Sequence, residues 1–232
     1  MPATVLSSYE PRPDATQADG LAASYQAQGY AHLRRFVSSE IAMGFLTRLK
    51  RDLAAQGIGF DRLMKAQPLL RQPAAELYGY HYPPLATFHW GMTPAIEAIL
   101  GEALLPTYAY FRLYRAGDIC RVHGDRPACE HSLSLTLAYA DGIAWPLEVD
   151  SRRTDTPYAR ADDLWREDEQ ANAVAMEAGD AVLYQGVHHH HGRSQPNPNR
   201  WSAHLFLHWV ARDGPYADAA FDGQKPPSQI DF

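Results

Sequence analysis

A series of short β-prone segments after Leu105 restricts what this chain can fold into. The segments are rich in β-branched and aromatic residues and span 108–114, 132–139, 145–149, 173–176, 181–184 and 201–210. Gly-Asp or Asp-Gly pairs at 117–118, 141–142 and 179–180 mark turns between them. Many short strands at this spacing, preceded by helices, predict a mainly β fold in which flanking helices accompany an antiparallel double-sheet barrel.

The N-terminal part has a different composition and fewer β-prone segments. Residues 1–19 are rich in Pro, Ser and small side chains, and we interpret them as a loose arm. A short helix over 20–28 and a strand over 29–33 follow. At 232 residues the chain suits one domain. We expect that domain to span 20–232, with a helical flank (20–105), a β core (106–210) and a C-terminal tail (211–232).

The clearest helix is expected between Ser38 or Ser39, which are suitable N-cap residues, and Gly57. Its apolar residues recur at helical spacing: Ala42, Phe45, Leu46, Leu49 and Leu53. The aromatic- and proline-rich stretch 60–90 predicts an irregular loop with short helical pieces. A short helix over 95–100 should follow Thr93-Pro94. The charged stretch 151–170 predicts an insertion loop between two strands.

Bulk properties exclude several classes of protein. A net charge of −6 and a pI near 6.0 argue against a nucleic-acid partner. No segment resembles a signal peptide and no apolar run reaches the ~18 residues of a membrane span, so we expect a cytoplasmic protein without a membrane partner. The only two cysteines, Cys120 and Cys129, indicate reduced thiols rather than a disulfide scaffold. A redox or metal role is the alternative for both, and nothing indicates the oligomeric state.

His123-Gly124-Asp125 is the most informative short motif. In an extended strand the His and the Asp point to the same face, because side chains alternate. A third ligand from the distant run of four histidines, 188–191, would give two nitrogens and one carboxylate oxygen on one side of a metal. This facial arrangement leaves three positions open and suits non-haem Fe(II). The simpler alternative is a surface histidine beside a turn aspartate.

Which of the four histidines would serve is a question of strand parity. A strand through them would point alternate residues inward, so at most two could face one metal. We favour His191, which directly precedes Gly192-Arg193 and stands nine positions before Arg200. His189 has the same parity and is the second candidate. Alternatively, the four histidines form a solvated tract that scavenges metal ions.

Arg200 opens an otherwise apolar and aromatic strand. A buried arginine is costly unless an anion meets it. Its forked guanidinium suits a dicarboxylate, and Ser202 on the same face would add a hydroxyl donor. The alternative is an edge-strand arginine that pairs with an acidic residue.

Taken in order, these motifs resemble the Fe(II)- and 2-oxoglutarate-dependent dioxygenases, close to their prolyl-hydroxylase-like branch. The resemblance covers about half of the chain, 106–210, and rests on the segments 114–118, 123–125, 134–139 and 179–184, on His191 and on 200–202. It implies a double-stranded β-helix (jelly-roll, cupin-like) core. It further implies that His123, Asp125 and His191 bind iron and that Arg200 and Ser202 bind 2-oxoglutarate, with Tyr114 and Tyr139 as further cosubstrate-binding residues. The family has one histidine where this chain has four.

The activity implied is hydroxylation of an unactivated C–H bond of an amino acid, peptide or protein side chain, with release of succinate and carbon dioxide. Related halogenases lack the carboxylate, so Asp125 favours hydroxylation. Arg121 and Arg126 bracket the motif and could meet a substrate anion or be solvated. The aromatic residues between 78 and 90 could line the pocket or form a core under the loop, and Trp145 should pack in the barrel. Two rivals are a non-catalytic metal-binding barrel and a cupin-type oxygenase that does not use 2-oxoglutarate.

Overall fold

A computed structural model describes residues 15–154 and 160–224. Its helices are α1 (Ala15–Gln28), α2 (Ser39–Ala55) and α3 (Pro83–Leu100). A seven-stranded sheet has the order β1-β10-β6-β12-β4-β3-β2. Its members are β1 (Tyr30–Leu33), β2 (Met64–Lys65), β3 (Ala74–Tyr78), β4 (Leu104–Arg115), β6 (His131–Tyr139), β10 (Ala181–Tyr184) and β12 (Trp201–Ala211). A five-stranded sheet, β8-β5-β11-β7-β9, contains β5 (Cys120–His123), β7 (Leu147–Asp150), β8 (Ala161–Asp162), β9 (Ala171–Val174) and β11 (His191–Arg193).

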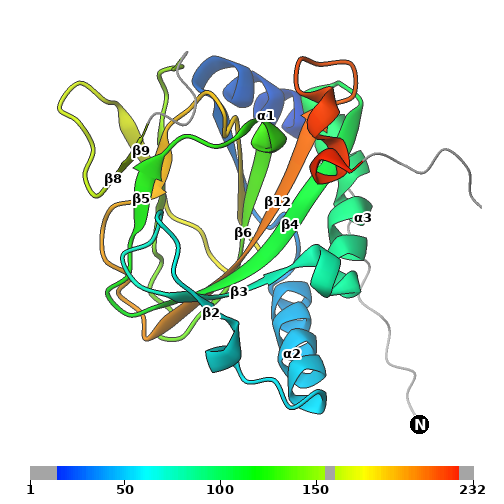
Figure 1. The fold of residues 1–232 in the computed structure, drawn as a ribbon. Coiled ribbons are helices and arrows are strands. Elements are labelled where there is room, and N and C mark those ends of the chain that lie inside the picture. The colour runs from blue at the N-terminus through cyan, green and yellow to red at the C-terminus, as the bar shows by residue number, and fades with distance from the viewer. Residues whose placement is uncertain (1–14, 155–159, 225–232) are drawn as a thin grey trace, which may run out of the picture.

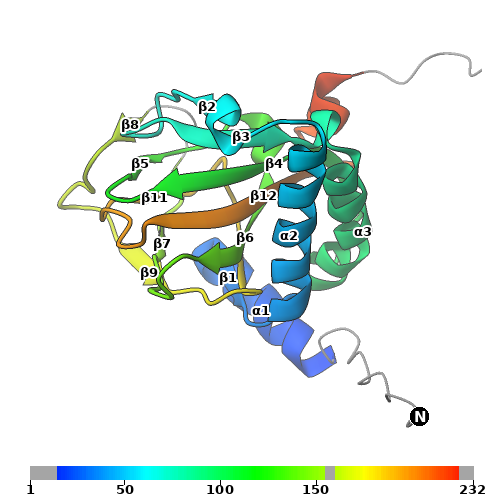
Figure 2. The same ribbon diagram turned by 90° about the horizontal axis from the view of Figure 1, so that it is seen from below.

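The chain from β4 onwards forms a double-stranded β-helix. Apart from the β7–β9 step and the short insertion β8, consecutive strands alternate between the two sheets, and every recorded pairing is antiparallel. Figures 1 and 2 show the two sheets facing each other, with the helices on the far side of the larger one. The mainly β, jelly-roll fold class expected from the sequence is confirmed.

The two faces of the larger sheet carry different side chains. Along β12, Leu205, Leu207 and Trp209 belong to the apolar core that the sheet shares with the three helices. The alternate residues, His204, Phe206 and His208, point the other way, as the period of two requires. Polar groups are therefore buried between the two sheets, while apolar burial beneath the helices stabilises the fold.

Helix α2 follows the sequence prediction closely. Ser38 is its N-cap, and its hydroxyl accepts a hydrogen bond from the backbone N–H of Ile41. Glu40 lies in the first turn, where a negative charge is favourable. Gly57 adopts a left-handed conformation (φ 68°) just after the helix. The expected apolar residues are buried against the sheet except Phe45, which is half-buried.

The flank was predicted less well. Helix α1 begins at Ala15, so the interpretation of 15–19 as loose arm is wrong, while 1–14 lie outside the described residues. The stretch 60–90 contains β2, β3 and the start of α3 rather than only irregular loop. Pro94 lies inside α3, whereas the sequence predicted that it would precede a short helix over 95–100. The helix continues through it because residues on both sides of the proline, such as Leu85 and Ile96, are buried in the same core.

Other element boundaries in the structure also differ from those predicted. The insertion 151–170 contains the short strand β8, with 155–159 outside the described residues, and the tail contains a 3-10 segment, Ala217–Gly223. Strand β7 begins at Leu147, two residues after Trp145, and β9 ends at Val174. Among the described residues, no helix combines the length and the apolar character needed to cross a lipid bilayer.

Candidate functional site

His123, Asp125 and His191 meet between the two sheets. Strands β5 and β11 are antiparallel neighbours in which His123 is the pairing partner of His191, so both side chains emerge on one face. Their ring centroids lie 4.4 Å apart. Asp125 places Oδ1 3.5 Å from His123 Nε2 and Oδ2 3.4 Å from His191 Nε2. One donor atom from each residue lies within 4.8 Å of the other two.

Backbone groups fix the orientation of these three side chains. The Nδ1–H groups donate to backbone carbonyls, from His123 to Arg121 O (2.6 Å) and from His191 to His189 O (2.9 Å). Each Nε2 lone pair therefore faces Asp125. Gly186 accepts from the Asp125 backbone N–H (2.8 Å), and a Cβ at Gly186 would lie 2.3 Å from Asp125 Oδ2. The absence of a side chain at 186 gives the carboxylate its space.

The charge state of this group suits a cation. Burial, and then the proximity of His191, lower the pKa of His123, so that its imidazole is neutral at pH 7. Burial would raise the pKa of Asp125, but the imidazoles of His191 and His123 outweigh it and hold the pKa well below the ordinary value. Neutral imidazole and ionised carboxylate are the forms that bind metals. Two oriented nitrogens and one carboxylate thus fit an Fe(II) ion with open coordination positions.

The four consecutive histidines have separate surroundings rather than one strand. His188 donates to Thr154 O, His189 to Asp150 O, and His190 lies 3.1 Å from Glu169 Oε1. A turn that begins at Gln185 carries the first three, and β11 begins only at His191. The His189 ring packs against Gly29, where a Cβ would come within 2.3 Å of it. The tract is buried or half-buried, unlike a solvated scavenging tract, and the structure brings His191 rather than His189 to Asp125.

The expectation that Arg200 points into the barrel is wrong. Its side chain is 76% exposed, and Nε donates to Asp141 Oδ1 (2.8 Å). Arg200 directly precedes β12, where the turn around Asp141 provides a carboxylate at the surface. The alternative weighed for this residue, an arginine at the sheet edge paired with an acidic side chain, describes what the structure shows.

The buried arginine of the barrel interior is Arg193. It is 1% exposed and lies on β11, two residues after His191. Its guanidinium lies over the Trp145 ring (5.2 Å), and Nη2 donates to Ser134 Oγ (3.3 Å). Nε is buried without a hydrogen-bond partner. Among the described residues no carboxylate lies within ion-pair distance of Arg193. Its buried positive charge is therefore uncompensated, and one anion would neutralise it.

Tyr114 belongs to the same cluster. Its ring lies 6.0 Å from the Arg193 guanidinium and edge-on to Trp145. Its hydroxyl accepts from Arg112 Nη1 (3.1 Å). Arg112 is a second buried guanidinium, but Glu76 neutralises it, with Nη2 and Oε1 2.6 Å apart. Arg193 is thus the buried arginine of the pair that still lacks a counter-ion.

Ser202 and Tyr139 lie farther from the arginine. Ser202 is buried, pairs with Tyr114 and Tyr139 across the sheet, and accepts from Asn197 Nδ2 (3.1 Å). The Tyr139 hydroxyl donates to Trp145 O (3.5 Å). Neither side chain has a recorded contact with Arg193, so the structure does not bring them to it as it does Tyr114. Trp145 packs inside the barrel, as expected, and also lies against the guanidinium.

Both cysteines are free and buried. Burial raises the pKa of the Cys120 thiol, and raises that of Cys129 well above the ordinary value. Cys129, Asp125 and His208 form a second group with metal-ligand spacing. A protonated thiol is a poor ligand, so this group binds a cation less well than Asp125 with its two imidazoles.

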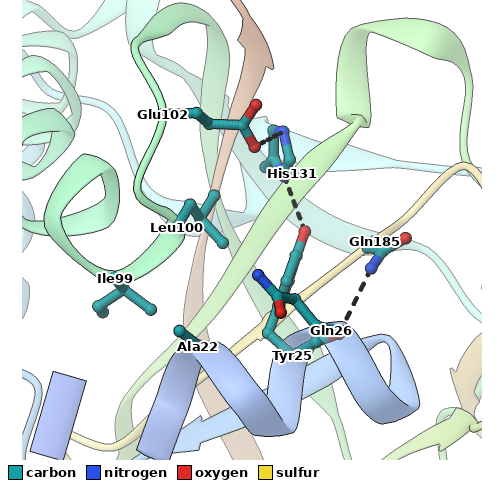
Figure 3. Close-up of a pocket in the computed structure, with 8 residues that line it drawn as sticks. All are labelled: Ala22, Tyr25, Gln26, Ile99, Leu100, Glu102, His131 and Gln185. Atoms are coloured by element: carbon teal, nitrogen blue, oxygen red, sulfur yellow. Dashed lines mark hydrogen bonds and ion pairs between the residues drawn. The ribbon is translucent and has the colours of Figure 1, made fainter. Parts of the chain in front are cut away.

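A pocket of about 240 Å³ lies on the opposite face of the larger sheet, away from these groups, between α1 and α3 (Figure 3). There the Tyr25 hydroxyl lies 2.7 Å from His131 Nδ1, and Glu102 Oε1 lies 3.4 Å from His131 Nε2. Ile99 and Leu100 of α3 line the apolar side. The pocket shares no residue with the His123–Asp125–His191 group.

Two histidines beneath the helices make stability depend on pH. Burial lowers the pKa of His89 and of His131 to about 4 each. In the unfolded chain both would titrate near 6.5, so the unfolded state takes up more protons below that pH and stability falls from pH 6.5 towards 4. At pH 5 each histidine should lower the free energy of unfolding by about 2 kcal/mol relative to pH 7. Urea unfolding at both pH values measures this, and His89→Gln should remove about half of the combined effect. Equal pH dependence in wild type and variant would contradict the assignment.

Comparison with known proteins places the fold. No family model matches the chain, and no curated protein matches it in sequence. SnoK, a non-haem α-ketoglutarate-dependent carbocyclase of nogalamycin biosynthesis, is 13% identical with a TM-score of 0.66 over 88% of each chain. A Pseudomonas putida prolyl-4-hydroxylase is 17% identical (TM-score 0.57, 84% of this chain and 98% of that one). HygX from Streptomyces hygroscopicus, solved with nickel and 2-oxoglutarate, is 10% identical (TM-score 0.59, 84% and 87%). The chain therefore has the double-stranded β-helix fold of the Fe(II)- and 2-oxoglutarate-dependent oxygenases.

Proposed function

We propose that this protein is an Fe(II)- and 2-oxoglutarate-dependent oxygenase that hydroxylates an unactivated C–H bond of an amino acid, peptide or protein side chain. The observation that carries the proposal is one juxtaposition inside the barrel. His123, His191 and the buried Arg193 lie on the paired strands β5 and β11, and Asp125 lies two residues after β5. A metal would bind the three metal-suited side chains, and a dicarboxylate would neutralise Arg193, which lacks a counter-ion.

In this proposal His123, Asp125 and His191 hold the iron, and Arg193 binds the distal carboxylate of 2-oxoglutarate in place of Arg200. Ser134, which contacts the guanidinium, and the nearby Tyr114 hydroxyl would lie beside that carboxylate. When bound, iron and 2-oxoglutarate supply the activation of oxygen, with succinate and carbon dioxide as products. The chain itself orients the two imidazoles through backbone carbonyls, and the Tyr184 ring packs against that of His191, with ring centroids 4.5 Å apart.

The choice of hydroxylation goes beyond the fold. The structurally similar proteins include a carbocyclase, an epimerase and a prolyl-4-hydroxylase, so this architecture accommodates several outcomes. They support the prolyl-hydroxylase-like branch only loosely. Hydroxylation is proposed because Asp125 completes the metal-suited group, whereas related halogenases lack this carboxylate. A non-catalytic metal-binding barrel would not need a buried arginine that lacks a counter-ion.

Two measurements test the proposed function. Under anaerobic conditions, Fe(II) and 2-oxoglutarate together should give the weak visible charge-transfer band of a chelated complex, which neither gives alone. In air, a panel of amino acids and peptides should then be screened for stimulated succinate release. No band and no succinate would contradict the proposal. The band without succinate for any substrate would leave a metal- and 2-oxoglutarate-binding protein and refute catalysis of this kind.

A further inference from the structure

Arg126 lies at the rim of the proposed centre. It directly follows Asp125, and its side chain is 47% exposed. The guanidinium lies 4.3 Å from the centroid of the Tyr108 ring. On the inner side, the Tyr108 ring is 4.5 Å from that of His208, whose Nδ1 lies 2.9 Å from Ser132 Oγ. Ser132 in turn donates to Asp125 Oδ2 (3.3 Å). The Arg126 guanidinium is thus linked to Asp125 of the metal-suited group through contacts of Tyr108, His208 and Ser132.

The present partner of Arg126 is a carboxylate from the C-terminal segment. Asp222 Oδ1 lies 2.6 Å from Arg126 Nη2, and the Asp222 side chain is 31% exposed. The segment that carries it, Ala217–Gly223, lies beside the ends of β4 and β12 (Figure 1). A half-exposed ion pair of this kind contributes only about 0–1 kcal/mol. A second carboxylate could therefore replace Asp222 at little cost.

The backbone under Asp222 also favours its release. Phe221 and Asp222 both adopt left-handed conformations, with φ of 53° and 57°. This region is unfavourable for residues other than glycine, most of all for a bulky one such as phenylalanine. The Phe221 ring lies against the exposed Trp90, with ring centroids 6.1 Å apart. Displacing Asp222 would let this backbone relax.

Neither of the other two arginines near the motif offers an exchangeable carboxylate partner at the rim. Arg121, on the opposite side of the motif, donates to Asp163 Oδ1, Pro68 O and Leu70 O, which holds the 60–70 stretch to β5. Arg193 lies inside the barrel, where the proposed function assigns it to 2-oxoglutarate. Arg126 is thus the rim arginine whose carboxylate partner is exchangeable.

We propose that Arg126 binds a carboxylate of the substrate, and that Asp222 occupies this position until the substrate displaces it. The substrate class is then a carboxylate-bearing molecule, such as an amino acid or the C-terminus of a peptide, held by its anion over Tyr108. This inference rests on the proposed function, since it assigns a role at the same centre. Tyr108 keeps the guanidinium in place by a cation–π contact while the anion changes.

The test is equilibrium binding, which requires no turnover. The probes are N-acetyl-leucine, N-acetyl-phenylalanine and N-acetyl-proline, each compared by calorimetry with its own primary amide. At least one acid should bind the wild-type chain about two- to fivefold more tightly than its amide, as expected for an ion pair with a half-exposed guanidinium. Arg126→Gln should abolish that preference. Arg121→Gln, the matched control on the other side of the motif, should preserve it.

Asp222→Asn tests displacement separately. Asparagine tolerates the left-handed conformation, so the change removes the charge and spares the backbone. The variant should bind the acid about two- to fivefold more tightly than wild type, because the internal competitor is gone. Acid should also change the emission of Trp90 in the wild type, and Trp90→Phe should lose that change.

Two results would overturn the inference: no acid binds more tightly than its amide, or Arg126→Gln keeps the preference. In the second case, loss of the preference in Arg193→Gln would assign the anion to the inner arginine instead. Because binding is measured on the metal-free chain, failure here is distinct from failure of the proposed function. An Arg126-dependent preference without any succinate release would refute the oxygenase and leave the anion site standing. Succinate release with equal binding of acid and amide would do the reverse.

Discussion

Replacing Asp125 by Ala is expected to abolish succinate formation and to weaken metal binding by at least about 100-fold. Loss of a residue that only supports a metal ligand already costs about 10–100-fold in affinity. Asp125 offers more than support, since it contributes the one negative charge and an oxygen close to both imidazoles. The fold should survive, because each imidazole left behind keeps its hydrogen bond to a backbone carbonyl and Ser132 keeps its contact with Cys129 O. Calorimetric titration with Ni(II) and a succinate assay measure the two effects.

The matched control for this variant is Asp141→Ala. It also removes a carboxylate that pairs with a basic side chain, but at the surface beside Arg200. Metal binding should be unchanged within about twofold, since exposed pairs contribute little. If Asp125→Ala binds Ni(II) as tightly as Asp141→Ala does, the assignment of Asp125 as a ligand fails.

Arg193→Gln is expected to weaken 2-oxoglutarate binding by at least about 30-fold. Truncating one partner of a buried charge pair costs about 2 kcal/mol or more. Arg200→Gln should change the affinity by less than about twofold, because that side chain is exposed and already paired with Asp141. The measurement is the dissociation constant of 2-oxoglutarate in the presence of metal, for wild type and both variants.

A second ligand separates a binding role of Arg193 from a merely structural one. 2-Oxobutyrate keeps the keto acid end but lacks the distal carboxylate. Wild type should prefer 2-oxoglutarate strongly, whereas Arg193→Gln should bind the two keto acids with similar affinity. A general loss of structure would weaken both ligands and leave their ratio unchanged. Retention of the wild-type ratio in the variant would remove Arg193 from the cosubstrate site.

The barrel and the three metal-suited residues could be predicted because their signals are local or simply ordered. Strand alternation predicts one face for His123 and Asp125, and the structure brings them together although β5 ends at His123. Turn residues separate the strands of the core. Strand parity reduced the four histidines to His189 and His191, and the position of His191 relative to Gly192 and Arg200 favoured it, but the physical reason for the choice differs. The structure has a turn through 188–190, with the His189 ring held against Gly29 and Asp150 O.

The arginine could not be predicted by the same reasoning. Arg200 directly precedes a long strand with a clear sequence pattern, whereas Arg193 lies on a strand of three residues, too short to produce a pattern. The usable signal was parity: Arg193 stands two positions after His191, as Asp125 stands two after His123. Of helix α3 only the part over 95–100 was predicted, because Pro94 and the many aromatic residues before it conceal the helical period of 83–94. Burial of apolar residues on both sides of Pro94 nevertheless stabilises the whole helix.

Gly186 shows that the centre depends on more than its donors. A methyl group there would lie 2.7 Å from Cys129 O and 2.8 Å from Ser132 Oγ as well as against the Asp125 carboxylate. These neighbours belong to η3 (Pro127–Cys129) and β6, neither of which can retreat without disturbing the larger sheet. A designer who transplants the constellation into another scaffold must therefore copy four positions, of which the fourth contributes empty volume and a backbone carbonyl but no metal-binding atom.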